Sequence, residues 1–228
     1  MKYKLLLSDA DGTLFDFDAG KHRALVTVLD RFGLPSGDDA VCVFTRINES
    51  IWKRFERGLI SQDRLSVERF EDFLKEMGKR GDPEGLSLAF IAELGNQRLL
   101  IPGADRFCRR ISEKMPIYLV TNGIAKVQRS RVAGSGVEPY LAGIVISEEI
   151  GCAKPNPEML YAAMKMSGLA DLGGAVMLGD SITADIQAAR NAGIDSVLFL
   201  NGKAAPRGHG ATFVANTYKE AEDYILRE

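Results

Sequence analysis

Short apolar runs alternate with longer stretches of helical periodicity along most of this chain. Five runs have the length of a buried strand and end in a polar or glycine-containing turn: 3–7, 117–120, 143–146, 175–178 and 196–200. Between them, apolar residues recur at helical spacing over 104–114, 124–136, 157–167 and 182–192. Apolar strands that alternate with helices are typical of a parallel sheet covered on both faces. The pattern predicts an α/β fold, with functional residues at the carboxyl ends of the strands.

The region 16–99 interrupts this alternation because it contains only helical patterns. These patterns cover 21–32, 39–55, 62–77 and 84–96. Turn-rich segments near its two ends, at 16–20 and 101–103, are suited to be hinges. We therefore expect two domains, a core formed by 1–15 and 100–228 and a helical insertion formed by 16–99. The core is expected to end in a short strand near 212–214 and a terminal helix.

The charge balance argues against two classes of partner. The chain carries 29 Lys and Arg against 31 Asp and Glu, a formal net charge of −2. Binding to a nucleic acid polymer or an anionic membrane surface normally requires a strong basic excess or basic clusters. The apolar run after the first residues stops after three leucines, and no stretch approaches the roughly 20 apolar residues of a membrane span. We expect neither nucleic acid nor membrane among the partners.

Cysteine and histidine usage narrows the chemistry further. Cys42, Cys108 and Cys152 are odd in number and contain no C-x-x-C pair, so they are expected to be reduced thiols in a cytoplasmic protein. The two histidines, His22 and His209, lie far apart and have no ligand-spaced companion. A zinc site or a Ser-His-Asp hydrolase is therefore not expected.

Polar residues gather where the predicted strands end. They follow the first, second and fourth core strands or precede the helix between the third and fourth: Asp9, Asp11, Thr121, Asn122, Lys154, Asp180 and Asp185. Parallel strands bring their carboxyl ends to one edge of the sheet, so these side chains are expected to meet there.

This set of groups suits phosphoryl transfer through a covalent aspartyl phosphate. The Asp9 carboxylate can attack phosphorus, and Asp11, two residues later, can protonate the leaving oxygen and then activate water. Asp9 and Asp180 offer the oxygen ligands that Mg²⁺ prefers, and Asp185 is a further candidate ligand. Two further groups, Lys154 and Thr121, can bind the phosphate oxygens.

Each of these residues also has a purely structural interpretation. Asp9 and Asp11 can be solvated carboxylates in a turn, and Thr121 can cap the helix that follows it. Lys154 can be an exposed surface lysine, and Asp180 and Asp185 can complement the dipole at a helix N-terminus. The presence of all these groups at predicted strand ends favours catalysis.

At these positions the sequence resembles the haloacid dehalogenase superfamily of phosphatases. Its four motifs occur here in order: Asp9-x-Asp11-Gly12-Thr13-Leu14, Thr121-Asn122-Gly123, Lys154-Pro155-x-Pro157 and Gly179-Asp180-Ser181-x-x-x-Asp185. The resemblance implies a Rossmann-like core and a helical insertion of the subclass I cap type. It implies Asp9 as nucleophile and Asp11 as acid and base, with Thr121, Asn122 and Lys154 on the substrate phosphate. It also implies Mg²⁺ bound by Asp9, the Asp11 backbone carbonyl and Asp180, while Asp185 supports the metal or orients Lys154.

Within that superfamily the sequence is similar to the branch of nucleotidases that hydrolyse non-canonical pyrimidine nucleoside monophosphates. The similarity lies in three stretches: 8–15, 51–52 followed by 56–60, and 145–155. Two positions depart from the branch: Ser8 replaces an aromatic residue, and Gly12 replaces the Glu of some members. The implied substrate is a small phosphorylated metabolite, with a nucleoside 5′-monophosphate preferred.

Three other functions remain open at this point. A phosphatase for phosphoglycolate or a sugar phosphate would share the same motifs, and so would a phosphomutase. A sensor that binds a phosphorylated ligand without turnover is the non-enzymatic alternative. A dehalogenase is disfavoured because carbon–halogen cleavage requires neither an acid at Asp11 nor a metal.

Overall fold

The computed structural model describes residues 1–227, which form two compact units. The core unit contains Met1–Phe17, Leu99–Ala125 and the chain from Val132 onward, and the helical unit contains Asp18–Arg98 and Lys126–Arg131. Within the described chain, no helix combines the length and the apolar composition that a membrane crossing requires.

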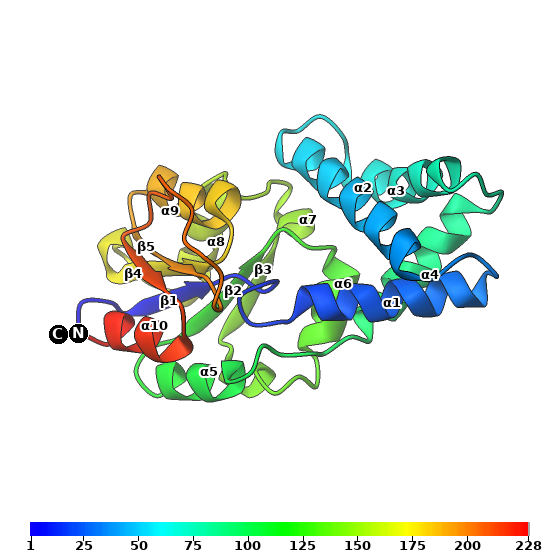
Figure 1. The fold of residues 1–228 in the computed structure, drawn as a ribbon. Helices are drawn as coiled ribbons and strands as arrows, with labels where there is room; N and C mark the ends of the chain where they lie inside the picture. The colour runs from blue at the N-terminus through cyan, green and yellow to red at the C-terminus, as the bar shows by residue number, and fades with distance from the viewer. Residues whose placement is uncertain (228) are drawn as a thin grey trace. The chain divides into compact units, whose positions relative to one another are not determined.

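The core unit is built on a parallel sheet of six strands in the order β3-β2-β1-β4-β5-β6 (Figure 1). The strands are β1 (Leu5–Ser8), β2 (Ile117–Thr121), β3 (Gly143–Ile146), β4 (Ala175–Gly179), β5 (Asp195–Phe199) and β6 (Phe213–Ala215). All five neighbouring pairs are parallel. The predicted α/β fold with a Rossmann-like parallel sheet is confirmed, including the short last strand.

Helices cover both faces of this sheet (Figure 1). On one face, α5 (Ala104–Ser112) and α10 (Tyr218–Ile225) pack against strand residues such as Leu6 and Leu119. On the other face, α8 (Glu158–Ser167) and α9 (Gln187–Ala192) pack against Leu5, Leu7 and Val120. Successive residues of β1 thus face opposite sides and are all buried, which explains why the strand is apolar throughout.

The segment after β4 differs from the single helix expected over 182–192. It begins as a π-helix, Ile182–Ile186, and only then continues as α9. The backbone N–H groups of Asp185 and Ile186 both donate to the carbonyl of Ser181, over 2.9 and 3.1 Å. Widened turns of this kind are frequent at functional sites, and this one holds Asp185 close to the end of β4.

The helical unit contains α1 (Phe17–Arg31), α2 (Asp38–Glu56), α3 (Gln62–Glu76) and α4 (Pro83–Gly95), the four helices expected from periodicity. Its core is aromatic, with the Phe44 ring centroid 5.1 Å from that of Phe70 and 5.4 Å from that of Phe90. The buried guanidinium of Arg69 lies over the rings of Phe70 and Phe90. This unit therefore has a hydrophobic core of its own.

Part of a helix predicted to belong to the core lies in the helical unit instead. Residues 126–131 of α6 (Ala125–Val132) belong there. Arg131 Nε donates to the Gln97 carbonyl over 3.1 Å, and Arg98 Nε donates to the Ser130 carbonyl over 3.3 Å. These contacts connect segments about thirty residues apart, which local periodicity does not reveal. The predicted boundaries of the insertion, 16–99, remain a prediction.

The remaining elements of the core unit are short. Helix α7 (Ser147–Ile150) directly follows β3, and two 3₁₀ turns, Glu138–Tyr140 and Leu172–Gly174, precede β3 and β4. The connections that follow β1, β2, β3 and β4 all leave from the carboxyl ends of the strands, so they converge on one edge of the sheet.

Candidate active site

Five of the predicted site residues, Asp9, Asp11, Thr121, Asn122 and Asp180, lie at the carboxyl ends of three adjacent strands, β2, β1 and β4. Asp9 directly follows β1, Thr121 is the last residue of β2, and Asp180 directly follows β4. The Asp9 N–H donates to the Leu178 carbonyl over 2.8 Å, which continues the β1–β4 ladder by one residue. Regular sheet pairing therefore fixes the Asp9 backbone.

Lys154 is the centre of this cluster. Its side chain is buried, and Nζ donates to Asp9 Oδ1, Asp185 Oδ1 and the Val120 carbonyl, each over 2.6 Å. An ammonium has three donors, so these contacts use all of them. The structure thus excludes the interpretation of Lys154 as an exposed surface lysine.

Lys154 and the carboxylates around it shift one another's pKa. Burial alone would lower the pKa of Lys154, but the carboxylates of Asp185 and Asp9 outweigh burial and raise it, so the ammonium stays protonated. Burial raises the pKa of Asp9, an effect that Lys154 opposes and that Asp185 and Asp180 reinforce. One buried ammonium cannot neutralise three neighbouring carboxylates, so the site carries excess negative charge.

The pKa of Asp180 is raised as well. Burial, followed by the charge of Asp185, raises the pKa of Asp180 to about 7. Among the described residues, Asp9, Asp180 and Asp185 form a group whose carboxylate oxygens lie within 4.8 Å of one another. This spacing and donor chemistry fit a hard divalent cation such as Mg²⁺, which would relieve the repulsion.

The turn after β1 brings the backbone close to Asp180. Gly12 has φ +81°, and a Cβ at this position would lie 2.3 Å from Asp180 Oδ2. The Gly12 N–H donates to the Phe15 carbonyl over 3.0 Å, and this closes the turn that carries the half-buried Asp11. Glycine is therefore required here both by the backbone conformation and by the space that Asp180 occupies.

The π-helix determines how Asp185 is used. Asp185 Oδ1 accepts from Lys154 Nζ, and Oδ2 accepts the Ser181 N–H over 3.0 Å. The Asp185 side chain is buried. Of the two roles left open by the sequence, orienting Lys154 has these contacts in its favour, although the carboxylate also belongs to the acidic cluster.

Thr121 and Asn122 differ in what they contact. Thr121 is buried, and its Oγ1 accepts the Gly123 N–H over 3.2 Å. The Asn122 amide bonds to the backbone of Lys154 through both ends, accepting the Lys154 N–H over 2.7 Å and donating to the Lys154 carbonyl over 2.8 Å. Their contact with a phosphate remains a prediction for both residues.

One further residue that supports the site is not part of any sequence motif. Tyr218, on α10, donates its hydroxyl to the Thr13 carbonyl over 2.6 Å. Its ring stacks between Phe107 and Phe199, with centroid distances of 5.0 and 4.6 Å. Tyr218 therefore supports the turn that carries Asp11. It lies outside every motif and 205 residues from Thr13, so the sequence offered no signal for it.

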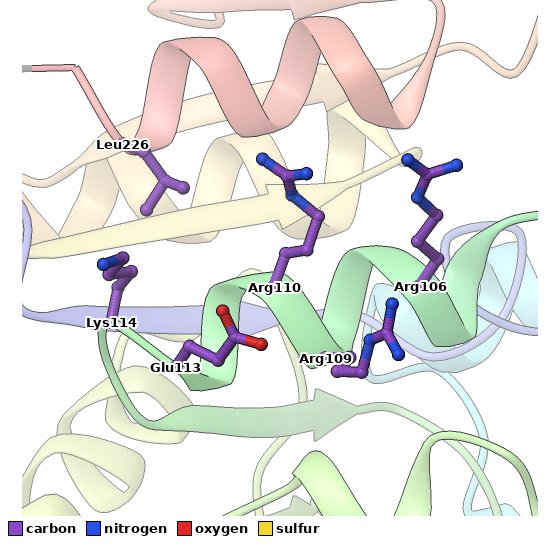
Figure 2. Close-up of a pocket in the computed structure, with 6 residues that line it drawn as sticks. All are labelled: Arg106, Arg109, Arg110, Glu113, Lys114 and Leu226. Atoms are coloured by element: carbon purple, nitrogen blue, oxygen red, sulfur yellow. The ribbon is translucent and has the colours of Figure 1, made fainter.

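A surface cavity elsewhere on the core unit does not belong to this site. It is lined by the basic residues of α5, by Glu113 and Lys114 just beyond that helix, and by Leu226 after α10 (Figure 2). Lys114 lies three residues before the first residue of β2, so this cavity lies toward the amino ends of the strands. Arg110 is paired there with Glu222 over 2.7 Å.

Comparison with known sequences relates the chain to phosphate-ester chemistry. It is 34% identical over 202 residues to the pyrimidine 5′-nucleotidase PynA of Streptococcus pneumoniae, covering 87% of this chain and 84% of that protein. It is 29% identical over 231 residues to the pyrimidine 5′-nucleotidase YjjG of Escherichia coli, covering 100% of both chains.

Comparison with solved structures agrees with this relationship. A crystal structure of the HAD-hydrolase YfnB of Bacillus subtilis bound to magnesium has a TM-score of 0.91 to this chain, with 28% sequence identity and full coverage of both chains. The YfnB sequence is 31% identical over 195 residues, covering 86% of this chain and 83% of that protein. A family model described as haloacid dehalogenase-like hydrolase matches residues 3–193. The chain therefore belongs to the haloacid dehalogenase-like hydrolases.

Proposed function

We propose that this protein is a Mg²⁺-dependent phosphomonoester hydrolase that works through an aspartyl phosphate on Asp9. The observation that carries the proposal is the buried contact of 2.6 Å between Lys154 Nζ and Asp9 Oδ1 at the edge of the sheet. An ammonium held beside a carboxylate nucleophile reduces its repulsion with an incoming phosphate and stabilises charge that develops on the phosphoryl oxygens.

In the first step, an oxygen of Asp9 attacks phosphorus and the bond from phosphorus to the ester oxygen breaks. Asp11 donates a proton to that oxygen, so the alcohol leaves neutral. In the second step, Asp11 removes a proton from a water molecule that attacks phosphorus, and the bond from phosphorus to Asp9 breaks. Inorganic phosphate leaves, and Asp9 is regenerated as a carboxylate. Thr121 binds the phosphoryl oxygens during both steps. Lys154 does so with the donor that it directs at Asp9 Oδ1, because Asp185 and the Val120 carbonyl hold its other two donors.

The acidic cluster would hold the metal. The residues proposed as ligands are Asp9, Asp180 and the main-chain carbonyl of Asp11, with Asp185 beside them. Bound Mg²⁺ supplies positive charge that lowers the repulsion between the carboxylates and the substrate phosphate. The carboxylate spacing and the raised pKa of Asp180 support this assignment.

For the substrate we propose a pyrimidine nucleoside 5′-monophosphate. The support is that two relatives over most of the chain, PynA and YjjG, are named pyrimidine 5′-nucleotidases. The helical unit is proposed as the cap that recognises the nucleoside, over the predicted range 16–99. A cytoplasmic location is proposed from the three free cysteines.

A substrate panel with and without Mg²⁺ tests this function. Pyrimidine and purine nucleoside monophosphates, phosphoglycolate and a hexose phosphate are ranked by kcat/KM, with inorganic phosphate release as the readout. We expect pyrimidine nucleotides to rank first, and no turnover in EDTA. Asp9→Asn, which removes the nucleophile at almost constant volume, should retain less than about 1% of the activity, a loss of roughly 3 kcal/mol or more in transition-state stabilisation.

The outcomes separate the alternatives. A higher rank for phosphoglycolate or a hexose phosphate would overturn the nucleotide assignment but keep the hydrolase. Isomerisation of the hexose phosphate without phosphate release would indicate a phosphomutase. Binding without turnover of any substrate by the folded protein would favour the sensor and refute the enzyme.

A further inference from the structure

The end of β2 contacts Lys154 in three places. The Val120 carbonyl accepts from Nζ over 2.6 Å, and the Asn122 amide accepts the Lys154 N–H over 2.7 Å and donates to the Lys154 carbonyl over 2.8 Å. The first contact holds the tip of the side chain and the other two hold its backbone. Lys154 is thus fixed at both ends by one short segment.

The Asn122 contacts depend on the amide group. A primary amide offers an acceptor and a donor side by side, and Asn122 uses one of each on a single residue. Aspartate at this position would have no donor for the Lys154 carbonyl, and an apolar side chain of the same size would have neither group. The two hydrogen bonds between the Asn122 amide and the Lys154 backbone therefore resemble the pair that two residues exchange in a β-sheet, with a side chain in place of one backbone.

Fixing the Lys154 backbone matters because a lysine side chain is flexible. Its ammonium sits on a four-carbon stem, and it must reach Asp9 and Asp185 at the same time, each over 2.6 Å. Lys154 lies in the connection between α7 and α8, outside any regular element. The two hydrogen bonds between Asn122 and the Lys154 backbone replace the restraint that a helix or strand would provide.

We infer that Asn122 is a positioning residue, which acts on the substrate phosphate through Lys154 and does not contact it with its own side chain. The inference rests on the proposed function, since it assigns a role within that reaction. It replaces the role expected from the sequence, in which Asn122 binds the phosphate. The two roles predict different coupling between Asn122 and Lys154.

A double-mutant cycle distinguishes them, with the affinity for inorganic phosphate in Mg²⁺ measured by calorimetry. The proteins are the wild type, Asn122→Ala, Lys154→Met and the double variant, with Lys154→Arg in place of Lys154→Met if the latter does not fold. A positioning role predicts that Asn122→Ala weakens binding about 10-fold and adds less than about 2-fold to the lysine variant. Independent effects that multiply in the double variant would overturn the inference.

A second measurement does not depend on phosphate binding or turnover. Amide hydrogen exchange of the Lys154 N–H should become at least about 10-fold faster in Asn122→Ala, because its acceptor is lost. An unchanged exchange rate would show that Asn122 does not hold the Lys154 backbone, which would refute the inference. If the wild type neither binds phosphate nor turns over substrate, the proposed function fails, while this exchange experiment still tests whether Asn122 holds Lys154.

Asn191→Ala is the matched control. Asn191 also bonds to this connection through its amide, donating to the Pro155 carbonyl over 2.9 Å. It is exposed, and its amide oxygen accepts from Gln187 instead of from the Lys154 N–H. We expect the phosphate affinity of this variant and the amide exchange rate of its Lys154 N–H to stay within about 2-fold of the wild type. An effect as large as that of Asn122→Ala would mean that any loosening of the connection suffices, which would overturn a specific role for Asn122.

Discussion

Asp185 Oδ1 lies 2.6 Å from Lys154 Nζ, and both side chains are at most 2% exposed. The second oxygen of Asp185 accepts the Ser181 N–H, so one carboxylate joins the lysine to the start of the π-helix. A buried ion pair of this kind constrains geometry, since separating the charges is costly in a low-dielectric environment. We therefore expect Asp185 to act first as the partner of Lys154 and second as a metal ligand.

The variant Asp185→Asn tests that order. An amide offers only one acceptor oxygen, so either Lys154 or Ser181 must lose its partner. We expect kcat/KM for the preferred phosphomonoester to fall by about 10- to 100-fold. The dissociation constant for Mg²⁺, measured by calorimetry, should change less than in Asp180→Asn. Equal losses of metal affinity in the two variants would instead make Asp185 a direct ligand.

The space beside Asp180 yields a prediction for Gly12→Ala. The new Cβ would need the position 2.3 Å from Asp180 Oδ2, in addition to a left-handed backbone. We expect the variant to lose Mg²⁺ affinity and phosphatase activity, and to lose about 1 kcal/mol of stability from backbone strain.

Gly151→Ala provides the control for Gly12→Ala. Gly151 has φ +78°, close to that of Gly12, but apart from its two chain neighbours no heavy atom of the described residues lies within 4 Å of its Cβ position. It should therefore lose similar stability in a urea titration and keep its metal affinity. Equal metal affinity in both variants would show that the contact with Asp180 has no consequence for the metal site.

Removing the Tyr218 hydroxyl should loosen the catalytic turn. In Tyr218→Phe the ring can keep its stacking with Phe107 and Phe199, while the Thr13 carbonyl loses its donor. We expect a stability loss of about 1 kcal/mol together with a several-fold fall in kcat, measured by urea unfolding and steady-state kinetics. Tyr118→Phe is the control, since it removes a hydroxyl donor to the Met166 carbonyl at 3.0 Å. It should lose similar stability at unchanged kcat, and a parallel fall in kcat would contradict the assignment.

Stability should depend on pH through Asp195. Burial alone would raise the pKa of Asp195, but hydrogen bonds from Lys2 and Tyr3 outweigh it and hold the pKa below its usual range. Because the folded-state pKa is lower than the unfolded-state value of about 3.9, the stabilisation is present above that value and is lost as the pH falls through the folded-state pKa.

Asp195→Asn should accordingly destabilise the protein at pH 7 and have little effect at pH 2.5. The side chain is 26% exposed, so solvent screening limits the difference at pH 7 to about 1 kcal/mol. Urea unfolding at the two pH values measures it, with the exposed Asp72→Asn as control. A difference that persists at low pH would indicate packing as the cause.

Local sequence properties were sufficient to predict most of the fold and the composition of the site. Strands that are apolar throughout must be buried on both faces, and residues that follow parallel strands must share one edge of the sheet. Asp9, Lys154, Asp180 and Asp185 accordingly come together in the core unit. The helices α1 to α4 were predictable because their apolar residues recur at helical spacing and no strand pattern lies between them.

Tertiary structure decided what individual side chains do within that frame. It assigned the Asn122 amide to the Lys154 backbone, placed Tyr218 on the Thr13 carbonyl, and joined residues 126–131 to the helical unit. Each of these depends on contacts between segments distant in the chain, whereas sequence periodicity reports only on neighbours within a few turns. The sequence by itself therefore determined which chemical groups gather at the site. Only the folded chain determined which of these groups contact one another.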